Sequence, residues 1–407
     1  MKIAIIGAGA AGCFAALHIR KFLPQADITL YEGGRKALAK VAVTGGGRCN
    51  LTNSFAQVGS LESVYPRGSR LMKRLLREFS HEDAYRWFEQ AGIRLVTQDD
   101  ECVFPVSQNA MEIVDKLLWL LRQSNVKLMT GHRTIRIQPQ PSGYELHFAH
   151  GARIQADRVL VTIGGTPRLS SCQLFSELNL EISAPVPSLF SLCLKQHPLT
   201  QLMGTVVSEV SASIAGTKMK ATGPLLITHW GLSGPAILKL SSYGARWLHE
   251  CGYKTRISVN WFGMQSESEV ASILGELAVR HPQKQLQSVF PTRFNSRLWL
   301  HLLDYCQMNP TARWAELGRK SYNRMAAMMT NHQLEVDGKN KFKEEFVTCG
   351  GVALSQINPS TLECKKHPGL FFAGEVLDVD AITGGFNLQA AWTMGYVAAK
   401  AIGKRPI

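Results

Sequence analysis

The chain has 407 residues, of which 45% are hydrophobic and 19% are charged. This composition is that of a globular protein with ample apolar material, and the length predicts two or three domains. No run of about 18 uncharged apolar residues occurs, and the nine cysteines are scattered without a CxxC pair. These features argue against a membrane span, a disulfide framework and a metal site, and we expect a reduced, cytoplasmic protein.

The formal net charge of +14 favours a polyanionic partner or an acidic ligand. The alternative is a basic enzyme whose charge has no bearing on its substrate.

The first segment predicts a strand, a glycine turn, a helix and a second strand. Ile3–Ile6 forms a short apolar run suited to a central parallel strand. Gly7, Gly9 and Gly12 then fit G-x-G-x-x-G at the start of an alanine-rich helix, whose N-terminus can bind a pyrophosphate. Glu32 ends the second strand, where a carboxylate can accept hydrogen bonds from a ribose. The segment predicts dinucleotide binding, with NAD and FAD both open.

Two later glycine segments favour FAD. Residues 156–168 predict a buried strand that runs into Gly164 and Gly165. Residues 369–402 predict a strand, a Gly-Glu pair, a loop with two glycines and a long helix. Two-domain flavoenzymes use this order, with an acid (here Glu375) on the ribityl chain. Asn387 and Gln389 lie in the first turn of the helix, where they can reach the flavin carbonyls.

Four motifs together resemble one protein family. They are GAGAAG at 7–12, TGGGRCNLTN at 44–53, LLITHWGLSGPAIL at 225–238 and GEVLDVDAITGGFNLQAAW at 374–392. The chain resembles the YhiN/BaiN-like flavoproteins over nearly its whole length. The resemblance implies a three-domain, FAD-dependent enzyme related to aminoacetone oxidases, bile-acid enone reductases and ribosomal RNA dihydrouridine synthases.

The resemblance also implies site residues. Gly45–Gly47 are expected beside FAD because a Cβ there would collide with it, and Arg48 is expected to point toward the pyrophosphate or the flavin ring. Asn50 and Asn53 would hold this loop by hydrogen bonds. Cys49 is either a packed thiol or the proton donor or redox group. The positions expected to bind FAD are Gly7, Gly9, Ala10, Ala11, Gly12, Glu32, Gly45, Gly46, Gly47, Arg48, Asn50, Gly164, Gly165, Gly374, Glu375, Gly384, Gly385, Phe386 and Asn387.

The fold class expected is α/β, a Rossmann-type FAD-binding domain with an inserted β-domain and a helical insertion. The expected bounds are 1–186 and 347–407 for the FAD domain, 187–265 and 330–346 for a β-barrel-like domain, and 266–329 for the insertion. Helices are predicted over 69–93 and 110–123, and a hairpin over 133–150. After Gly165 the chain lacks the TGDGY-like loop that relatives carry on the substrate side, so the resemblance does not identify the substrate.

Two functions are compatible with these features. The first is an NAD(P)H-fuelled reductase of an activated C=C, with a uridine of large-subunit ribosomal RNA as the leading substrate and the nicotinamide as a transient visitor. The second is a small-molecule flavoenzyme, an enone reductase or an amine oxidase. Arg67, Arg70, Arg74 and Arg77 recur at helical spacing, and the insertion interleaves basic residues with aromatic ones. Both patterns are typical of RNA contact, or else of solvated faces over core aromatics.

Overall fold

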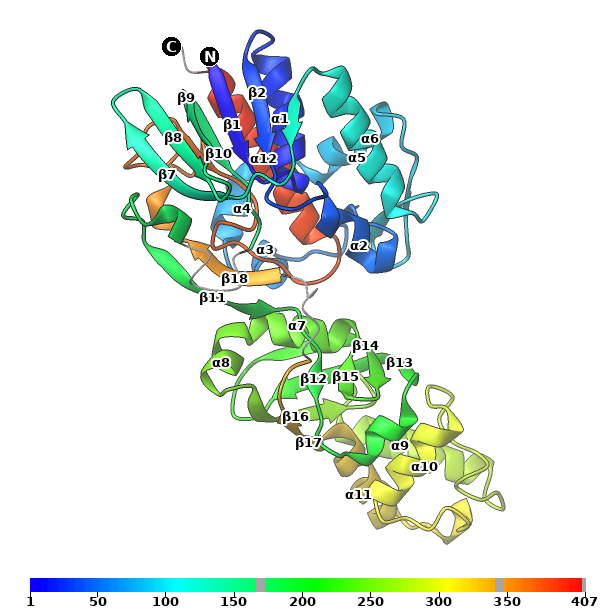
Figure 1. Ribbon diagram of the computed structural model, residues 1–407. Coiled ribbons are helices and arrows are strands. Elements are labelled where there is room, and N and C mark those ends of the chain that lie inside the picture. The colour runs from blue at the N-terminus through cyan, green and yellow to red at the C-terminus, as the bar shows by residue number, and fades with distance from the viewer. Residues whose placement is uncertain (166–172, 341–346, 405–407) are drawn as a thin grey trace. The chain divides into compact units, whose positions relative to one another are not determined.

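The computed structural model describes residues 1–165, 173–340 and 347–404, and the chain forms two compact units (Figure 1). The first unit comprises residues 1–186 and 347–407, and the second comprises residues 187–346. Each unit is described by itself below. The departure from the family pattern after Gly165 begins at residues 166–172, which lie outside the described residues.

The first unit is built on a parallel sheet with the order β19-β10-β1-β2-β6. Its strands are β1 (Lys2–Ile6), β2 (Asp27–Tyr31), β6 (Lys127–Met129), β10 (Arg158–Val161) and β19 (Leu370–Phe372). β1 occupies the centre, where its apolar residues Ile3–Ile6 are buried. The predicted Rossmann-type α/β class is confirmed, with the chain crossing from β1 to β2 through a helix.

Two long helices lie side by side against this sheet (Figure 1). They are α1 (Ala10–Phe22) and α12 (Phe386–Lys404), the helices that follow the first and the last of the predicted glycine motifs. Gly395 allows this packing, because a Cβ at that position would lie 2.7 Å from the carbonyl oxygen of Ala11. Helices from opposite ends of the chain therefore share one layer.

Further elements surround the sheet. The helices are α2 (Ala39–Gly47), α3 (Leu61–Val64), α4 (Ser69–Leu75), α5 (His81–Gln90), α6 (Ala110–Gln123) and the 3-10 turn η4 (Leu354–Gln356). The strands are β3 (Thr52–Asn53), β4 (Leu95–Thr97), β5 (Cys102–Pro105), β7 (Thr134–Gln140), β8 (Gly143–Phe148), β9 (Arg153–Ala156), β11 (Ile182–Ser188) and β18 (Val347–Val352). The helix over 110–123 and the hairpin within 133–150 are confirmed.

The prediction of one helix over 69–93 is wrong, because two helices occupy this stretch. α4 ends at Leu75 and α5 begins at His81. Ser80 caps α5, accepting a hydrogen bond from the Asp83 N–H while the Asp83 carboxylate accepts one from the Ser80 N–H. This reciprocal cap starts a new helix instead of continuing the old one.

The second unit is built on an antiparallel sheet with the order β12-β15-β14-β13-β16-β17. The strands are β12 (Leu192–Cys193), β13 (Val206–Ile214), β14 (Lys220–Thr228), β15 (Gly231–Ser233), β16 (Lys254–Asn260) and β17 (His332–Asp337). A bridge between Leu192 and Lys339 joins the first strand to the segment after the last one, so the sheet curls toward closure.

Helices pack on this sheet and share its core. They are η2 (Pro198–Leu202), α7 (Pro235–Tyr243), α8 (Ala245–Glu250), α9 (Glu267–Arg280), α10 (Ser296–Tyr305), η3 (Trp314–Glu316) and α11 (Arg319–Thr330). One hydrophobic cluster includes Val210 of β13, Trp299 of α10 and Met325 of α11. The division of this unit into a β-domain and a helical insertion stays a prediction.

Candidate functional site

The first glycine turn joins β1 to α1, and its glycines differ in what surrounds them. Gly7 has φ +103°, and a Cβ there would lie 2.5 Å from the carbonyl oxygen of Thr162. A Cβ on Gly12 would lie 2.1 Å from the carbonyl oxygen of Gly7. Gly9 faces open space, with no atom within 4 Å of a built Cβ. Gly7 and Gly12 thus serve the turn and its packing, and Gly9 leaves room beside the helix N-terminus.

Glu32 directly follows β2, the strand that neighbours β1, and its side chain binds two backbone segments. Its carboxylate accepts hydrogen bonds from the N–H of Ala8 (2.9 Å) and the N–H of Gly34 (2.7 Å). A cavity of about 460 Å³ opens at this point, at the carboxyl ends of β1 and β2, and Gly7, Glu32 and Gly165 are among its lining residues. Ligands of open α/β sheets bind at this edge, next to the point where strand order reverses.

The triple glycine of residues 44–53 has a left-handed backbone throughout. The φ angles are +58° at Gly45, +68° at Gly46 and +84° at Gly47. Gly46 and Gly47 face open space, whereas a Cβ on Gly45 would lie 2.9 Å from the backbone nitrogen of Asn50. The chain's own packing already requires glycine at position 45, and the expectation that all three glycines lie beside FAD stays a prediction.

Two asparagines connect this segment to the C-terminal glycine pair. The Asn53 amide donates to the carbonyl of Gly384 at 3.0 Å. The Asn50 amide, oriented to suit its neighbours, donates to the Thr52 carbonyl (3.0 Å) and accepts from the Gly385 N–H (3.3 Å). Gly385 is glycine because a Cβ would lie 2.2 Å from the Thr52 carbonyl oxygen. Residues far apart in the chain therefore form one polar clasp.

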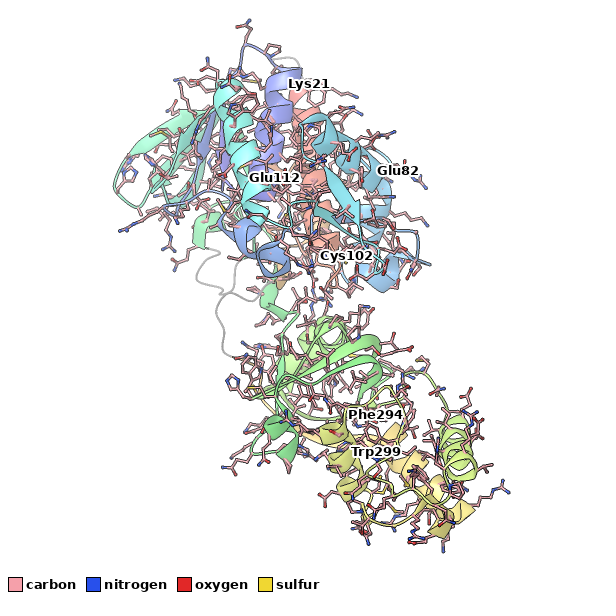
Figure 2. All side chains as sticks on the ribbon, turned by 90° about the vertical axis from the view of Figure 1, so that its right-hand side faces the viewer. Lys21, Glu82, Cys102, Glu112, Phe294 and Trp299 are labelled. Atoms are coloured by element: carbon pink, nitrogen blue, oxygen red, sulfur yellow. The ribbon has the colours of Figure 1, made fainter. Side chains whose placement is uncertain are left out.

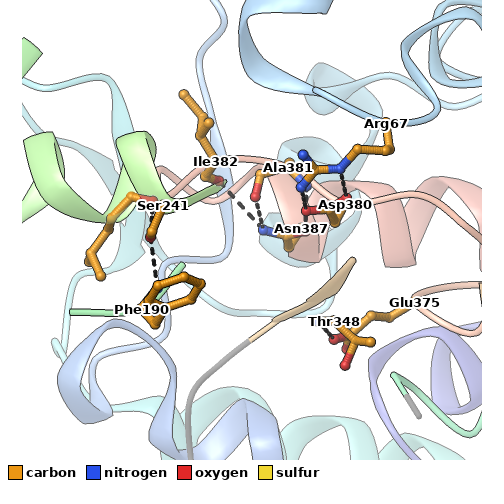
Figure 3. Close-up of polar contacts among 10 residues, drawn as sticks. Arg67, Phe190, Ser241, Thr348, Glu375, Asp380, Ala381, Ile382 and Asn387 are labelled. Atoms are coloured by element: carbon orange, nitrogen blue, oxygen red, sulfur yellow. Dashed lines mark hydrogen bonds and ion pairs between the residues drawn. The ribbon is translucent and has the colours of Figure 1, made fainter. Parts of the chain in front are cut away.

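The clasp fixes the start of α12, and the side chains there are already engaged (Figure 3). The Asn387 amide accepts from the N–H of Ala381 (2.9 Å) and donates to its carbonyl (2.9 Å). Gln389 is fully buried and accepts from the Thr52 hydroxyl at 2.6 Å. Both side chains hold the protein together, and the expectation that they also reach flavin carbonyls stays a prediction. The backbone N–H groups of the first turn have no intrahelical acceptor and remain suited to that task.

Glu375 lies on the loop after β19 and is also engaged. One carboxylate oxygen accepts from the N–H of Thr348 at 2.6 Å (Figure 3), and the other pairs with Lys40 at 2.6 Å. A Cβ on Gly165 would lie 2.5 Å from this carboxylate, whereas Gly164 faces almost open space. The structure thus brings Gly164, Gly165 and Glu375 together, as the late glycine segments predict.

Arg48 and Cys49 follow the triple glycine and differ sharply in exposure. Arg48 is exposed, with its guanidinium 4.4 Å from the centre of the Phe104 ring. Cys49 is fully buried, and burial raises the pKa of its thiol to about 12. A thiol with this pKa forms little thiolate at neutral pH, which disfavours a redox role and leaves a packed thiol and a proton donor both open.

An ion pair that the sequence did not reveal lies beside the clasp. Asp380 has no exposed side-chain surface, and its carboxylate pairs with Arg67 (Figure 3). Arg67 is therefore not part of an exposed basic face, which corrects that expectation. No local pattern in the sequence signals this pair, because the two residues are 313 positions apart. Among the described residues, no group of three or more His, Cys, Asp or Glu side chains could hold a metal ion.

The family can now be assigned. Residues 1–401 match the model described as the HI0933-like protein Rossmann domain. The chain belongs to this family. It is an FAD-dependent oxidoreductase, and the resemblance to the YhiN/BaiN-like flavoproteins is confirmed.

Two curated relatives match the HI0933-like chain over nearly its whole length. One is the 3-dehydro-bile acid delta(4,6)-reductase of Clostridium scindens, 28% identical over 413 residues, covering 100% of both chains. Another is the ribosomal RNA dihydrouridine synthase of Escherichia coli, 28% identical over 407 residues, covering 97% of this chain and 96% of the relative. The sequence identity is 28% for both relatives, although their names give two different substrate classes.

Solved structures agree on the fold alone. A 3-ketosteroid delta1-dehydrogenase from Sterolibacterium denitrificans superposes with a TM-score of 0.50 at 11% identity, covering 98% of this chain and 99% of that one. A quinol-fumarate reductase superposes with a TM-score of 0.51 at 13% identity, covering 99% and 71%.

The residues present fit FAD. Gly9, Gly46 and Gly47 each face space that a side chain would fill, and Glu32 lies beside the cavity at the strand ends. The first turns of α1 and α12 supply N–H groups for the pyrophosphate and the flavin ring. That these residues contact FAD stays a prediction. No described helix is long and apolar enough to cross a membrane.

Proposed function

We propose that the chain is an NAD(P)H-fuelled, FAD-dependent reductase of an activated C=C, acting in the cytoplasm on a uridine of large-subunit ribosomal RNA. In this reaction uridine, NAD(P)H and a proton give dihydrouridine and NAD(P)⁺. The C5=C6 double bond is reduced by a hydride at C6 and a proton at C5. Bound FAD supplies the hydride transfer between the nicotinamide and the base.

The net charge of +14 is the observation that carries the RNA substrate over a small molecule. A basic protein attracts a polyanion from a distance and holds it through its phosphates. The name of the Escherichia coli relative agrees with this choice. Both relatives are named for products or activities of reduction, which supports a reductase over an oxidase.

The chain's own residues orient and shield the reacting groups. Gly46 and Gly47 leave space for the cofactor, and the backbone N–H groups at the start of α12 hold its ring carbonyls. The clasp of Asn50 and Asn53 keeps these two parts in fixed register. One dinucleotide fingerprint is present in the sequence, so NAD(P)H binds transiently. Cys49, which follows the triple glycine, stays the candidate for the group that gives the proton to C5.

A small-molecule enone reductase is the second candidate, because the bile-acid reductase is equally similar. The two candidates differ in what a deletion strain lacks. Loss of one dihydrouridine from large-subunit ribosomal RNA, restored by the intact gene, is expected under the first. Complete ribosomal dihydrouridine in the deletion strain would overturn it.

A glycine variant connects this phenotype to the cofactor. Gly46→Val adds a side chain to the space left for FAD, and the purified variant should lack flavin absorption near 450 nm and fail to restore the modification. Gly216→Val is the matched control, since Gly216 has φ +75° and also faces open space, on a turn of the second unit. The control carries a similar backbone strain and should keep its flavin. Equal flavin loss in both variants would contradict the proposed cradle.

A further inference from the structure

A second cavity, of about 490 Å³, opens on the first unit away from the glycine turns. It lies beside α4 and the turn that carries Ser360. Its lining residues are Arg70, Lys73, Arg74, Leu75, Arg77, Glu78 and Ser360. The cavity is therefore almost entirely surrounded by cations.

The charge of this cavity is not neutralised within the described part of the chain. Arg70, Lys73, Arg74 and Arg77 are all exposed, and none forms an ion pair with another described residue. The single carboxylate, Glu78, is already paired with Lys400 at 2.7 Å, which holds its pKa below the usual range. Four positive side chains thus line one cavity without an ion-pair partner among the described residues.

The scaffold under these cations is rigid. On its other face, α4 buries Leu71, Met72 and Leu75. The Arg74 guanidinium donates to the Ser360 hydroxyl at 2.9 Å, which connects the helix to the opposite wall. A group of guanidinium and ammonium donors on one helix, with one hydroxyl opposite, is chemistry that recognises phosphate oxygens.

The distance between the rim of the cavity and the proposed flavin ring distinguishes a polymeric substrate from a small one. Glu78 at its rim pairs with Lys400, near the C-terminal end of α12. Lys400 lies about 20 Å along α12 from Phe386 at about 1.5 Å per residue, and the proposed flavin ring lies at the Phe386 end. A bile acid or free nucleoside held at the flavin does not extend this far, whereas a polynucleotide does.

We infer that this cavity binds backbone phosphates of the substrate RNA that flank the reduced uridine. The inference rests on the proposed function and names the surface that would hold its substrate. Phosphate contacts of this kind fix the register of a nucleic acid without reading its sequence. Arg67 is excluded from the surface because it pairs with Asp380, and Lys73 and Ser360 are added to it.

The test replaces two of these cations that make no other polar contact. The double variant Arg70→Gln/Arg77→Gln is compared with the control Lys218→Gln/Lys220→Gln, which removes the same charge from exposed positions on a hairpin of the second unit. The probe is a short single-stranded RNA containing uridines, with binding followed by fluorescence anisotropy from low to moderate salt. Flavin absorption checks that both variants are folded.

For two lost contacts, the slope of log K against log salt should fall by about 1.4, which corresponds to about 25-fold weaker binding at 0.1 M salt. The control should bind like the parent protein. Unchanged RNA affinity, or an equal loss in the control, would overturn the inference. A raised KM for NAD(P)H with unchanged RNA affinity would also overturn it, by assigning the cavity to the phosphates of the nicotinamide cofactor.

The outcome is separable from the proposed function. If the deletion strain keeps its dihydrouridine but the double variant loses RNA affinity, the proposed reaction fails and the binding surface stands. If the deletion strain lacks dihydrouridine but the double variant binds RNA normally, the reaction stands and the surface fails.

Discussion

Two stretches of the chain are rich in basic residues, and the structure uses them differently. Around α4, the cations line a cavity without internal ion pairs. In residues 266–329, most arginines are engaged by the protein itself. The contacts are Arg280 with Glu276, Arg293 with Gln265, Arg297 with the Gln201 carbonyl, Arg313 with Gln283, and Arg324 with the Cys306 carbonyl.

The aromatic residues of the same stretch are engaged as well. Trp299 and Trp314 are fully buried, and their indole N–H groups donate to the carbonyls of Leu286 (2.7 Å) and Val289 (3.0 Å). Tyr322 donates to the Leu317 carbonyl at 2.7 Å. The expectation that these aromatics stack on bases is therefore corrected in favour of the core alternative. Charge counts along a sequence do not distinguish available cations from those that hold a fold together.

The largest effect is expected for Trp299→Ala, which tests whether this aromatic residue belongs to the core or stacks on RNA bases. Trp299 stacks with Phe294 at 6.1 Å between ring centres (Figure 2), so its removal leaves a large cavity in the second unit. We expect a loss of about 4 kcal/mol in the free energy of unfolding. Urea unfolding followed by circular dichroism measures it. A variant that keeps the parental stability but binds RNA more weakly would instead support stacking of Trp299 on RNA bases.

A second test uses pH. Burial, with His301 and His197 nearby, lowers the pKa of His332 to about 3 from 6.5. The unfolded chain then binds more protons, so stability is full above pH 6.5 and falls as the pH is lowered toward 3. From pH 7 to pH 5, the free energy of unfolding should drop by about 2 kcal/mol.

Replacement of the histidine provides the control for this titration. His332 accepts a hydrogen bond from the Trp261 indole at 3.0 Å, and a glutamine offers the same acceptor without a titrating ring. In His332→Gln the drop measured by urea unfolding at the two pH values should shrink. An undiminished drop would assign the effect to other groups.

The smallest effect is expected for Arg324→Gln. Its guanidinium donates to the Cys306 carbonyl at 3.0 Å, but the side chain is exposed and solvent screens the contact. We expect a loss of less than about 1 kcal/mol in stability and unchanged RNA affinity. Loss of RNA affinity, measured by the same anisotropy assay, would place this arginine on the binding surface and erase the contrast with α4.

The sequence predicted the parts of the fold that local patterns determine. The unit from β1 to β2 followed from one apolar run and three spaced glycines, and α6 agrees with the helix predicted over 110–123. The break at Ser80 was missed, because a reciprocal cap within a basic helical stretch has the same apolar period on both sides.

The site was predictable only where a glycine or acid lies on a recognised motif. Whether Gly45 makes room for a ligand or for Asn50 depends on the local fold, and both uses need the same residue type. Asn387 bonds to Ala381, and this could not be foreseen because the turn between them sets the contact. Asp380 and Arg67 meet across hundreds of residues, beyond the reach of any local pattern.

The polar clasp also sets the order in which a nascent chain can complete its site. Asn53 and Gly384 are 331 residues apart. At a synthesis rate of about 5–20 residues per second, Asn53 is synthesised roughly 20 to 70 seconds before Gly384. Meanwhile residues 187–346, which are contiguous, can fold. The clasp can therefore form only when synthesis of the chain is nearly complete. A chain truncated before Gly384 lacks the clasp.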